Sequence, residues 1–398
     1  MIKKIFLILI LFVLIFFAIF ITTLLTVGIE TNKFNKIISE KVSSTKNVNL
    51  KLKTVRFKLD FKELSLFLET QNPYINYKNI LIPVQNIKVY IDFLNSIKSG
   101  LKIKKVNLLF EELDISQVQK LSGAIKPSNF KSFLNNKIKK GVIISEVELF
   151  INEKSELSSF IAKGKVNDLE AELANGLKIF KTEFSFFADK DDILIKKIFG
   201  KFEDFKILDG DVRLNLEEGI KLNSNFNSEV NLNEKLLEKY DKLLNKYNLS
   251  KKIKFIDGNF NNNIFINLDK TYKIIDYKYE SSGLVKRSKL KLTKSIKNDI
   301  IIEEIKNIYL SDIQMKTYLS PKKFSIEGAG KYSFNNSEFL NLNFDTSLND
   351  DFLKLSTNFD FKNIIDLKII NYKKTNNSNA KVSLILEKKK NIIHIKKL

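Results

Sequence analysis

The stretch from Ile5 to Val27 contains 23 residues and no charge. As an α-helix it would be about 34 Å long at ~1.5 Å per residue, enough to cross a hydrocarbon core of about 30 Å. Lys3 and Lys4 precede it, so the positive-inside rule places the N-terminus in the cytoplasm. A cleaved signal peptide is the alternative, but its apolar core would be shorter and followed by an A-x-A-like site. We therefore predict an uncleaved transmembrane signal anchor at residues 1–30, with the rest of the chain exported.

Composition excludes several classes of chemistry. The chain has no cysteine, which excludes thiol catalysis, zinc ribbons and haem attachment. Its one histidine, His394, cannot form a multi-histidine metal site or a serine–histidine triad. The acidic residues Asp189, Asp191 and Asp192 lack the spacing of a calcium loop and are interpreted as a turn. We expect a protein that is not an enzyme and that uses no metal or cofactor.

The net charge of +21 is carried almost entirely by lysine. Only Arg56, Arg213 and Arg287 are arginines. Arginine makes the most specific bidentate contacts in nucleic-acid recognition, and an exported domain rarely meets nucleic acid. The charge is therefore interpreted as a solvated surface, and no nucleic-acid partner is expected.

Three segments have helical periodicity. The first is Thr31–Ser44, in a predicted amphipathic helix at residues 31–46. Its apolar stripe consists of Phe34, Ile37, Ile38 and Val42. The second is Asp114–Lys137, in which Pro127-Ser128 begins a second set of helical turns. The third is Asn233–Tyr247, where Asn233 suits the N-cap.

Elsewhere in residues 47–398 the apolar residues alternate with polar ones, as in strands with one dry face. Examples are Val48–Lys53, Val55–Phe61, Ile87–Ile91, Val106–Leu108, Val147–Ile151, Phe184–Phe186, Val212–Leu216, Ile264–Leu268, Tyr272–Ile274, Phe339–Phe344 and Val382–Leu386. Asn, Asp, Gly and Ser occupy the turns between them. We predict a mainly β chain with an elongated antiparallel, meandering sheet and a few short helices.

Such a sheet has a continuous apolar face that must be hidden from water. It can close on itself as a sandwich, or curl into a groove wetted by acyl chains; the same residues would line either. The predicted members of this face are Val48, Leu50, Leu52, Ile87, Val89, Ile91, Val147, Leu149, Ile151, Leu214 and Leu216. The membrane anchor favours the groove, because it fixes one end of the sheet beside lipid.

The order of elements resembles the AsmA-like family of inner-membrane-anchored periplasmic proteins. The resemblance covers the lysine-flanked anchor, the short helix, the strands through Phe61, the segment Ile80–Ile97 and the strand that starts at Ile103. Over about residues 1–115 the resemblance extends to the order of the elements. Beyond residue 115 only the general architecture is similar. It implies a periplasmic, chorein-like twisted β-groove that helps to move phospholipids to the outer membrane. Many members are longer than this chain, so residues 47–398 are expected to be either a fragment that is incomplete at the C-terminus or a short form.

The sequence thus predicts a single-pass inner-membrane protein whose periplasmic β-groove binds the acyl chains of membrane lipids. Its expected role is phospholipid transport to the outer membrane, or outer-membrane homeostasis. The alternative is a non-catalytic, tethered β-scaffold that binds envelope proteins during outer-membrane protein assembly.

Overall fold

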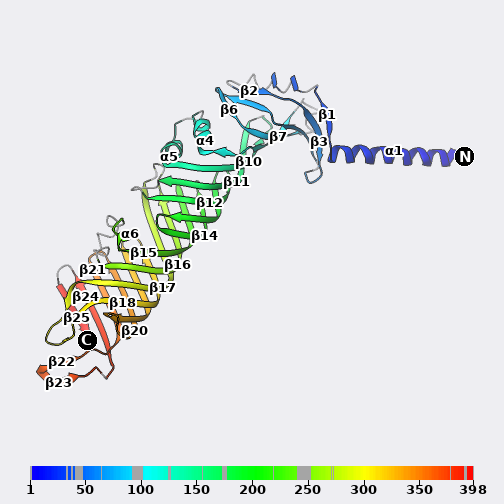
Figure 1. The fold of residues 1–398 in the computed structure, drawn as a ribbon. Helices are drawn as coiled ribbons and strands as arrows, with labels where there is room; N and C mark the ends of the chain where they lie inside the picture. The colour runs from blue at the N-terminus through cyan, green and yellow to red at the C-terminus, as the bar shows by residue number, and fades with distance from the viewer. Residues whose placement is uncertain are drawn as a thin grey trace. The chain divides into compact units, whose positions relative to one another are not determined.

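The computed structural model describes residues 2–32, 35–36, 39–40, 48–63, 65–91, 102–123, 127–154, 156–172, 177–217, 219–239, 252–269, 271, 273–376, 378–389 and 392–397 (Figure 1). The chain divides into two compact units. The first comprises Met1–Leu173 with Glu183–Leu194, and the second comprises Ala174–Thr182 with Ile195–Leu398. The main sheet has 20 strands, and each resolved pairing in it is antiparallel, which confirms the predicted fold class.

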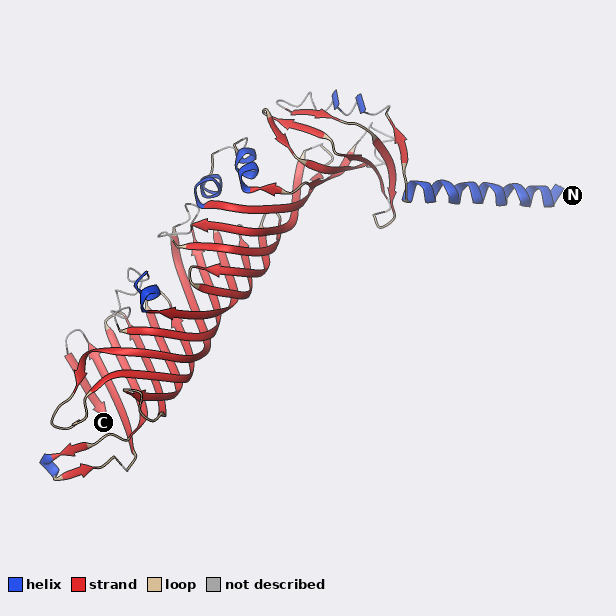
Figure 2. Ribbon diagram, in the orientation of Figure 1, coloured by secondary structure: helices blue, strands red, loops and turns tan. Residues whose placement is uncertain are grey.

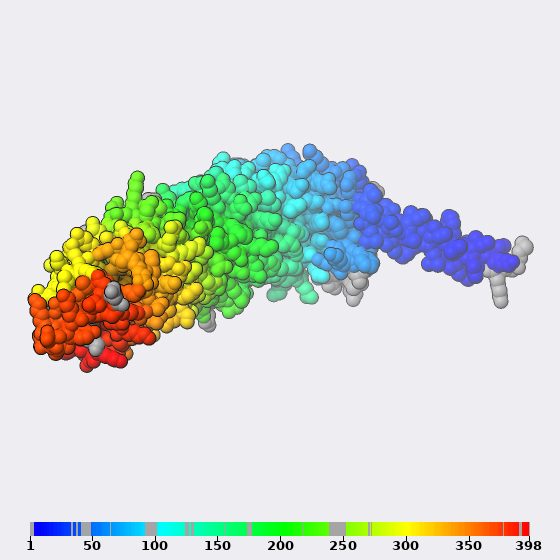
Figure 3. All heavy atoms as spheres, turned by 60° about the horizontal axis from the view of Figure 1, so that its bottom comes forward, coloured from blue at the N-terminus to red at the C-terminus, as the bar shows by residue number. Residues whose placement is uncertain are grey.

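The chain begins with helix α1 (Ile2–Leu25), whose apolar side chains are exposed from Ile5 to Phe20, whereas Leu24 in its last turn is 8% exposed. The span Lys4–Leu25 is long and apolar enough to cross a membrane. In Figure 3 this helix, in deep blue, projects from the rest of the first unit. It ends where Gly28 adopts a left-handed conformation (φ +78°) and donates its N–H to the Thr23 carbonyl at 2.8 Å. The predicted anchor is therefore a helix that the first unit does not bury.

The predicted helix at residues 31–46 lies largely outside the described residues, including its whole apolar stripe. Within it, Thr31 is the last residue of strand β1, and Asn35, Lys36, Ser39 and Glu40 are helical.

The strands of the first unit form a meander. Their bounds are β1 (Ile29–Thr31), β3 (Val55–Asp60), β4 (Ser65–Gln71), β7 (Val84–Ile91), β8 (Ile103–Phe110), β9 (Leu113–Asp114), β10 (Ile138–Ile151) and β11 (Leu157–Glu172). The pairing order is β1–β3–β4–β7–β8–β10–β11, and β9 extends β8 along β10. Strands β12 (Lys178–Ala188) and β13 (Asp192–Phe202) follow in the sheet and contribute residues to both units. A second, smaller sheet consists of β2 (Val48–Lys51), β5 (Tyr74–Tyr77) and β6 (Ile80–Ile82).

Two helices interrupt the first unit where the sequence predicts them. Helix α4 (Ile115–Ser122) is capped by Asp114, whose carboxylate accepts the backbone N–H groups of Ser116 and Gln117. Helix α5 (Asn129–Lys137) is capped by the hydroxyl of Ser128, which accepts the N–H of Lys131 at 3.1 Å. Figure 2 shows both helices, in blue, at the ends of the strands.

One face of the first unit carries a network of paired charges. The Lys58 ammonium lies 2.7 Å from the Glu69 carboxylate, and the Asn86 amide donates to Glu69 at 2.9 Å. Burial raises the pKa of the Glu69 carboxyl, but these two partners outweigh it, and the pKa falls below 4.5. Lys105 likewise pairs with Glu63. The buried charges of Glu69 and Lys105 are thus compensated by oppositely charged partners.

The second unit is also a meander, with longer strands. Their bounds are β14 (Phe205–Asn215), β15 (Ile220–Asn233), β16 (Ile253–Leu268), β17 (Ile274–Ile296), β18 (Ile305–Leu319), β19 (Lys323–Phe334), β20 (Leu340–Asn349), β21 (Phe352–Phe361), β24 (Ala380–Lys389) and β25 (Ile392–Lys397). Each pairs with the next strand named here. The remaining elements are helix α6 (Glu234–Lys239), β22 (Ile365–Leu367), the 3₁₀ helix η3 (Lys368–Ile370) and β23 (Tyr372–Lys374).

Helix α6 begins where the sequence predicts a helix. The side-chain oxygen of Asn233 accepts the N–H of Leu236 at 3.0 Å, so the predicted N-cap is confirmed. Residues 240–251, which include the rest of this predicted helix, lie outside the described residues.

Candidate functional site

In the first unit, the strand registers bring six of the predicted lining residues and their partners onto one face of the sheet. Directly opposed residues of antiparallel strands lie on the same face. Val89 is opposed to Val106, and Val106 to Leu149. Ile87, Leu108 and Val147 form the next row in the same way, and Ile91 and Ile151 continue their strands with the same alternation. We call this side of the main sheet the apolar face, and the opposite side the polar face.

In the second unit the predicted residue Leu214 lies in a row of apolar side chains, and we call this side of the sheet the apolar face of the second unit. Its row runs through Leu222, Ile266 and Tyr277, which oppose one another across β14 to β17. All four side chains are half-buried, and Leu216, directly after β14, is also half-buried. The positions between them on the same strands, such as Lys221, point to the polar face.

At the N-terminal end of the first unit, the small sheet β2–β5–β6 covers the apolar face. Leu50 is 7% exposed and packs with Val84 and Ile87, and Leu52 packs against this cluster from the edge. The cluster also contacts Val89. The predicted lining residues of this region are thus in a two-layer core. Val48 pairs with Tyr77 through the backbone, and its side chain lies outside the described residues.

The apolar face of the second unit has two local covers. Leu237 of α6 is buried against Val230 and Leu232 of β15. Farther along the sheet, Tyr332 contacts the rings of Phe334 and Phe359 edge-on at 4.9 and 5.8 Å, and its hydroxyl donates to the carbonyl of Asp360. Burial raises the pKa of the Tyr332 hydroxyl above its ordinary value, so this aromatic cluster stays neutral.

Away from these covers, most large apolar side chains on the apolar face of the second unit are half-buried, whereas Val285 and Ile313, which oppose each other on β17 and β18, are buried. The registers place large apolar side chains on it in consecutive rows across β15 to β24. Half-buried members are Leu222, Ile264, Ile266, Tyr277, Tyr279, Leu319, Phe324, Ile326, Leu342, Phe344, Leu348, Leu353, Leu355, Leu384 and Leu386. None of these was among the predicted lining residues, although their period-2 pattern is present in the sequence. This surface is the candidate site.

Glycines let aromatic rings lie flat on the apolar face. A Cβ on Gly210 would stand 2.7 Å from Cβ of Phe226, and one on Gly328 would stand 2.5 Å from Cζ of Phe344. Gly210 lies within β14 and Gly328 within β19, and the phenylalanine side chains beside them come from the neighbouring strands β15 and β20. The contact between each glycine and the phenylalanine of the next strand could therefore be recognised only once the strand register was known.

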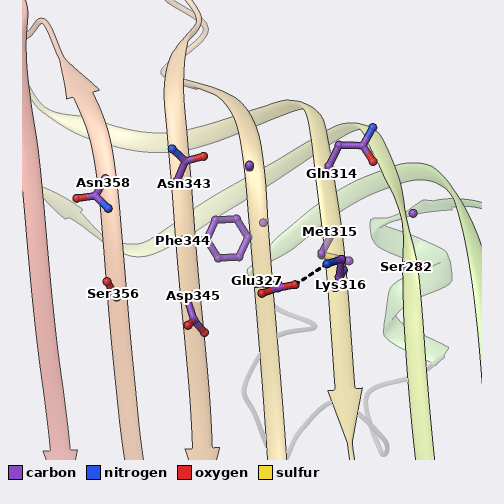
Figure 4. A pocket seen from close by; sticks show the side chains of 13 residues that line it. Ser282, Gln314, Met315, Lys316, Glu327, Asn343, Phe344, Asp345, Ser356 and Asn358 are labelled. Carbon is purple, nitrogen blue, oxygen red and sulfur yellow. Dashed lines mark ion pairs between the residues drawn. The ribbon is translucent and has the colours of Figure 1, made fainter.

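The polar face of the second unit has a hollow of ≈ 610 Å³ across β17 to β21 (Figure 4). In Figure 4 amide, hydroxyl and charged side chains surround it, including Asn343, Asn358 and Gln314. The Lys316 ammonium lies 3.1 Å from the Glu327 carboxylate within it. Met315 and Phe344 also line the hollow, but its amide and charged groups prefer water to hydrocarbon, which disfavours an acyl chain there.

Among the described residues, no group of three or more His, Cys, Asp or Glu side chains could hold a metal ion. Asp189 accepts the N–H groups of Asp191 and Asp192 at 2.9 and 2.8 Å, which confirms that this acidic cluster is a turn. His394 is exposed on the terminal strand β25.

Comparison with family models, curated proteins and solved structures finds no match to this chain.

Proposed function

We propose that this protein is a membrane-tethered lipid-binding protein whose apolar face takes up the acyl chains of phospholipids. Helix α1 would anchor it in the inner membrane with the N-terminus in the cytoplasm. The sheet would then lie in the periplasm and assist phospholipid transport to, or homeostasis of, the outer membrane, as the AsmA-like resemblance implies.

The observation that carries this proposal is the half-buried state of the apolar face in the second unit. Exposed apolar surface costs about 25 cal/mol per Å², or about 0.8 kcal/mol for each CH₂ group. Rows such as Ile326, Leu355 and Leu386 would recover part of this cost against acyl chains. Contiguous apolar patches rimmed by polar residues mark sites for partners or lipid.

Location supports a lipid as the ligand. The exposed helix α1 is continuous with the first unit through β1, so the sheet would begin next to the membrane that supplies acyl chains. The polar face, with paired lysine and glutamate side chains such as Lys163 with Glu146 at 3.2 Å, would face water.

The test uses the full chain, extracted from membranes in mild detergent and analysed by native mass spectrometry for bound phospholipid. Ile266 on the apolar face and Asn267 on the polar face are neighbours on β16, which makes Ile266→Asp and Asn267→Asp a matched pair. We expect Ile266→Asp to lower lipid occupancy several-fold and Asn267→Asp to leave it unchanged, with both variants folded by circular dichroism. Buried residues such as Leu50 are unsuitable here, because a charge there would disrupt the core. Lipid-free wild-type protein, or equal occupancy in both variants, would overturn the proposal.

A scaffold is the second candidate, and the edge strand β25 favours it. Ile392, Ile393 and Ile395 of this strand are all more than half exposed, and the register of β25 among the described residues is that with β24. A strand with an unpaired edge is a template for pairing with another β-segment. Photo-crosslinking from Ile393 in cells would identify a protein partner. A single crosslinked envelope protein, together with a lipid-free chain, would support the scaffold over the lipid-binding function.

A further inference from the structure

The turn after β3 lies beside the point where α1 joins the sheet. Strand β1 leaves the helix, and β3 runs antiparallel to it, so that Phe57 opposes Ile29. The residues of β3 after Phe57 therefore run back along the junction. A Cβ on Gly28 would stand 2.7 Å from Cγ of Lys58, which shows how closely β3 passes the end of the helix. In Figure 1 the turn after β3 lies next to the sheet end of α1.

This turn presents an exposed aromatic ring. Phe61 is 73% exposed, and Val27 and Ile29 at the helix junction are 65% and 41% exposed. Lys62 follows Phe61 and is also exposed. An apolar ring flanked by lysine, at the depth where a membrane-crossing helix ends, matches the composition of the membrane–water interface.

The turn holds Phe61 outward on a fixed backbone. The Asp60 carboxylate accepts the N–H groups of Lys62 and Glu63 at 2.9 and 3.2 Å, and it accepts the Tyr90 hydroxyl at 3.2 Å. The Glu63 carboxylate pairs with Lys105. The ring is therefore presented on a hydrogen-bonded turn, and a preordered turn loses little entropy when its ring is buried in a new environment.

We propose that the turn Asp60–Glu63 is a second membrane contact, in which Phe61 inserts into the interfacial layer of the bilayer beside α1. This inference rests on the proposed anchorage through α1. The contact fixes the β1–β3 edge of the first unit against the lipid surface, so that the sheet starts where acyl chains leave the bilayer. Lys62 extends its ammonium toward the phosphates while its methylene stem stays beside the ring.

The test uses tryptophan, which is absent from the chain. A Phe61→Trp variant then carries a single tryptophan, which replaces an exposed ring and disturbs no core. The full chain is reconstituted into phosphatidylcholine vesicles with or without bromine on the acyl chains, and tryptophan quenching is measured. Phe12→Trp, in the middle of α1, reports the anchorage itself. Phe187→Trp, an exposed position on β12, is the water-exposed control, because the pairings β1–β3–β4–β7–β8–β10–β11 separate β12 from the helix junction.

We expect Phe61→Trp and Phe12→Trp to be quenched by brominated lipid and Phe187→Trp to be unaffected. When anionic phospholipid is added to these vesicles, a further Lys62→Glu change should weaken the quenching of Phe61→Trp, and the same change should leave the quenching of Phe12→Trp unaltered. If Phe12→Trp is quenched while Phe61→Trp behaves like Phe187→Trp, the anchorage stands and this inference is wrong. If Phe12→Trp itself is not quenched, the proposed anchorage fails.

Discussion

Replacing Ile313 with alanine should destabilise the second unit by about 3–4 kcal/mol, whereas the same truncation at Leu355 should cost about 1.5–2 kcal/mol. Ile313 is 1% exposed and fills the space above two glycines: its Cγ2 lies 3.1 Å from the position of a Cβ on Gly328, and its Cδ1 lies 2.8 Å from one on Gly330. The substitution removes three carbon atoms, each worth about 0.8 kcal/mol of transfer free energy. Because the glycines have no side chains to fill the space left behind, the cost of an empty cavity is added to this.

Leu355 loses the same number of carbon atoms, but it is half-buried on the open part of the apolar face. Truncation at Leu355 therefore loses only part of the free energy of transfer from water to the protein interior, and it leaves no closed cavity. The measurement is guanidinium unfolding of the full chain in detergent micelles, followed by tyrosine circular dichroism. Equal costs at the two positions would refute the reasoning, because they would mean that Leu355 is enclosed as tightly as Ile313.

Two further substitutions test the packing and the charges. Gly283→Ala would place a Cβ 2.1 Å from the carbonyl oxygen of Asn259, and this overpacking should cost about 1–3 kcal/mol, while Ser282→Ala on the polar face should be near neutral in the same unfolding assay. The pKa of the Glu69 carboxyl is lowered below 4.5 in the folded state. The ionised carboxylate therefore contributes to the free energy of unfolding above about pH 4.5, and this contribution is lost as the pH falls through the pKa of the folded state. Urea titrations at pH 7 and pH 4 should therefore show a smaller loss of stability on acidification in Glu69→Gln than in the wild type, and an unchanged pH dependence would contradict the role of the Lys58 pair.

Local chemistry made several elements predictable. The caps at Ser128 and Asn233 are single-residue signals, and both begin a helix in the structure. The alternation around Ile87 and Val147 predicted strands, and the register places these residues in one row with Leu108. Short-range periodicity carries this information because neighbouring side chains on a strand must point to opposite faces.

What covers the apolar face could not be predicted, because it depends on contacts between distant segments. Leu50 and Ile266 have the same alternating pattern, yet Leu50 is buried under the small sheet and Ile266 is half-buried. Of the strand expected at Tyr272–Ile274, Tyr272 lies outside the described residues, Lys273 precedes the strand, and Ile274 is the first residue of β17. The close fit of Phe344 over Gly328 depends on the register between β19 and β20, which alternation alone does not determine.

The central claim, that the apolar face contacts acyl chains, can be tested by placing a benzophenone amino acid at neighbouring positions of β19. Phe324 is on the apolar face and Ser325 is on the polar face, so the two positions differ in face but not in location along the sheet. After irradiation of the full chain in native membranes, mass spectrometry should find phospholipid crosslinked at position 324 and little at position 325. Crosslinks to lipid at both positions, or at neither, would contradict the account.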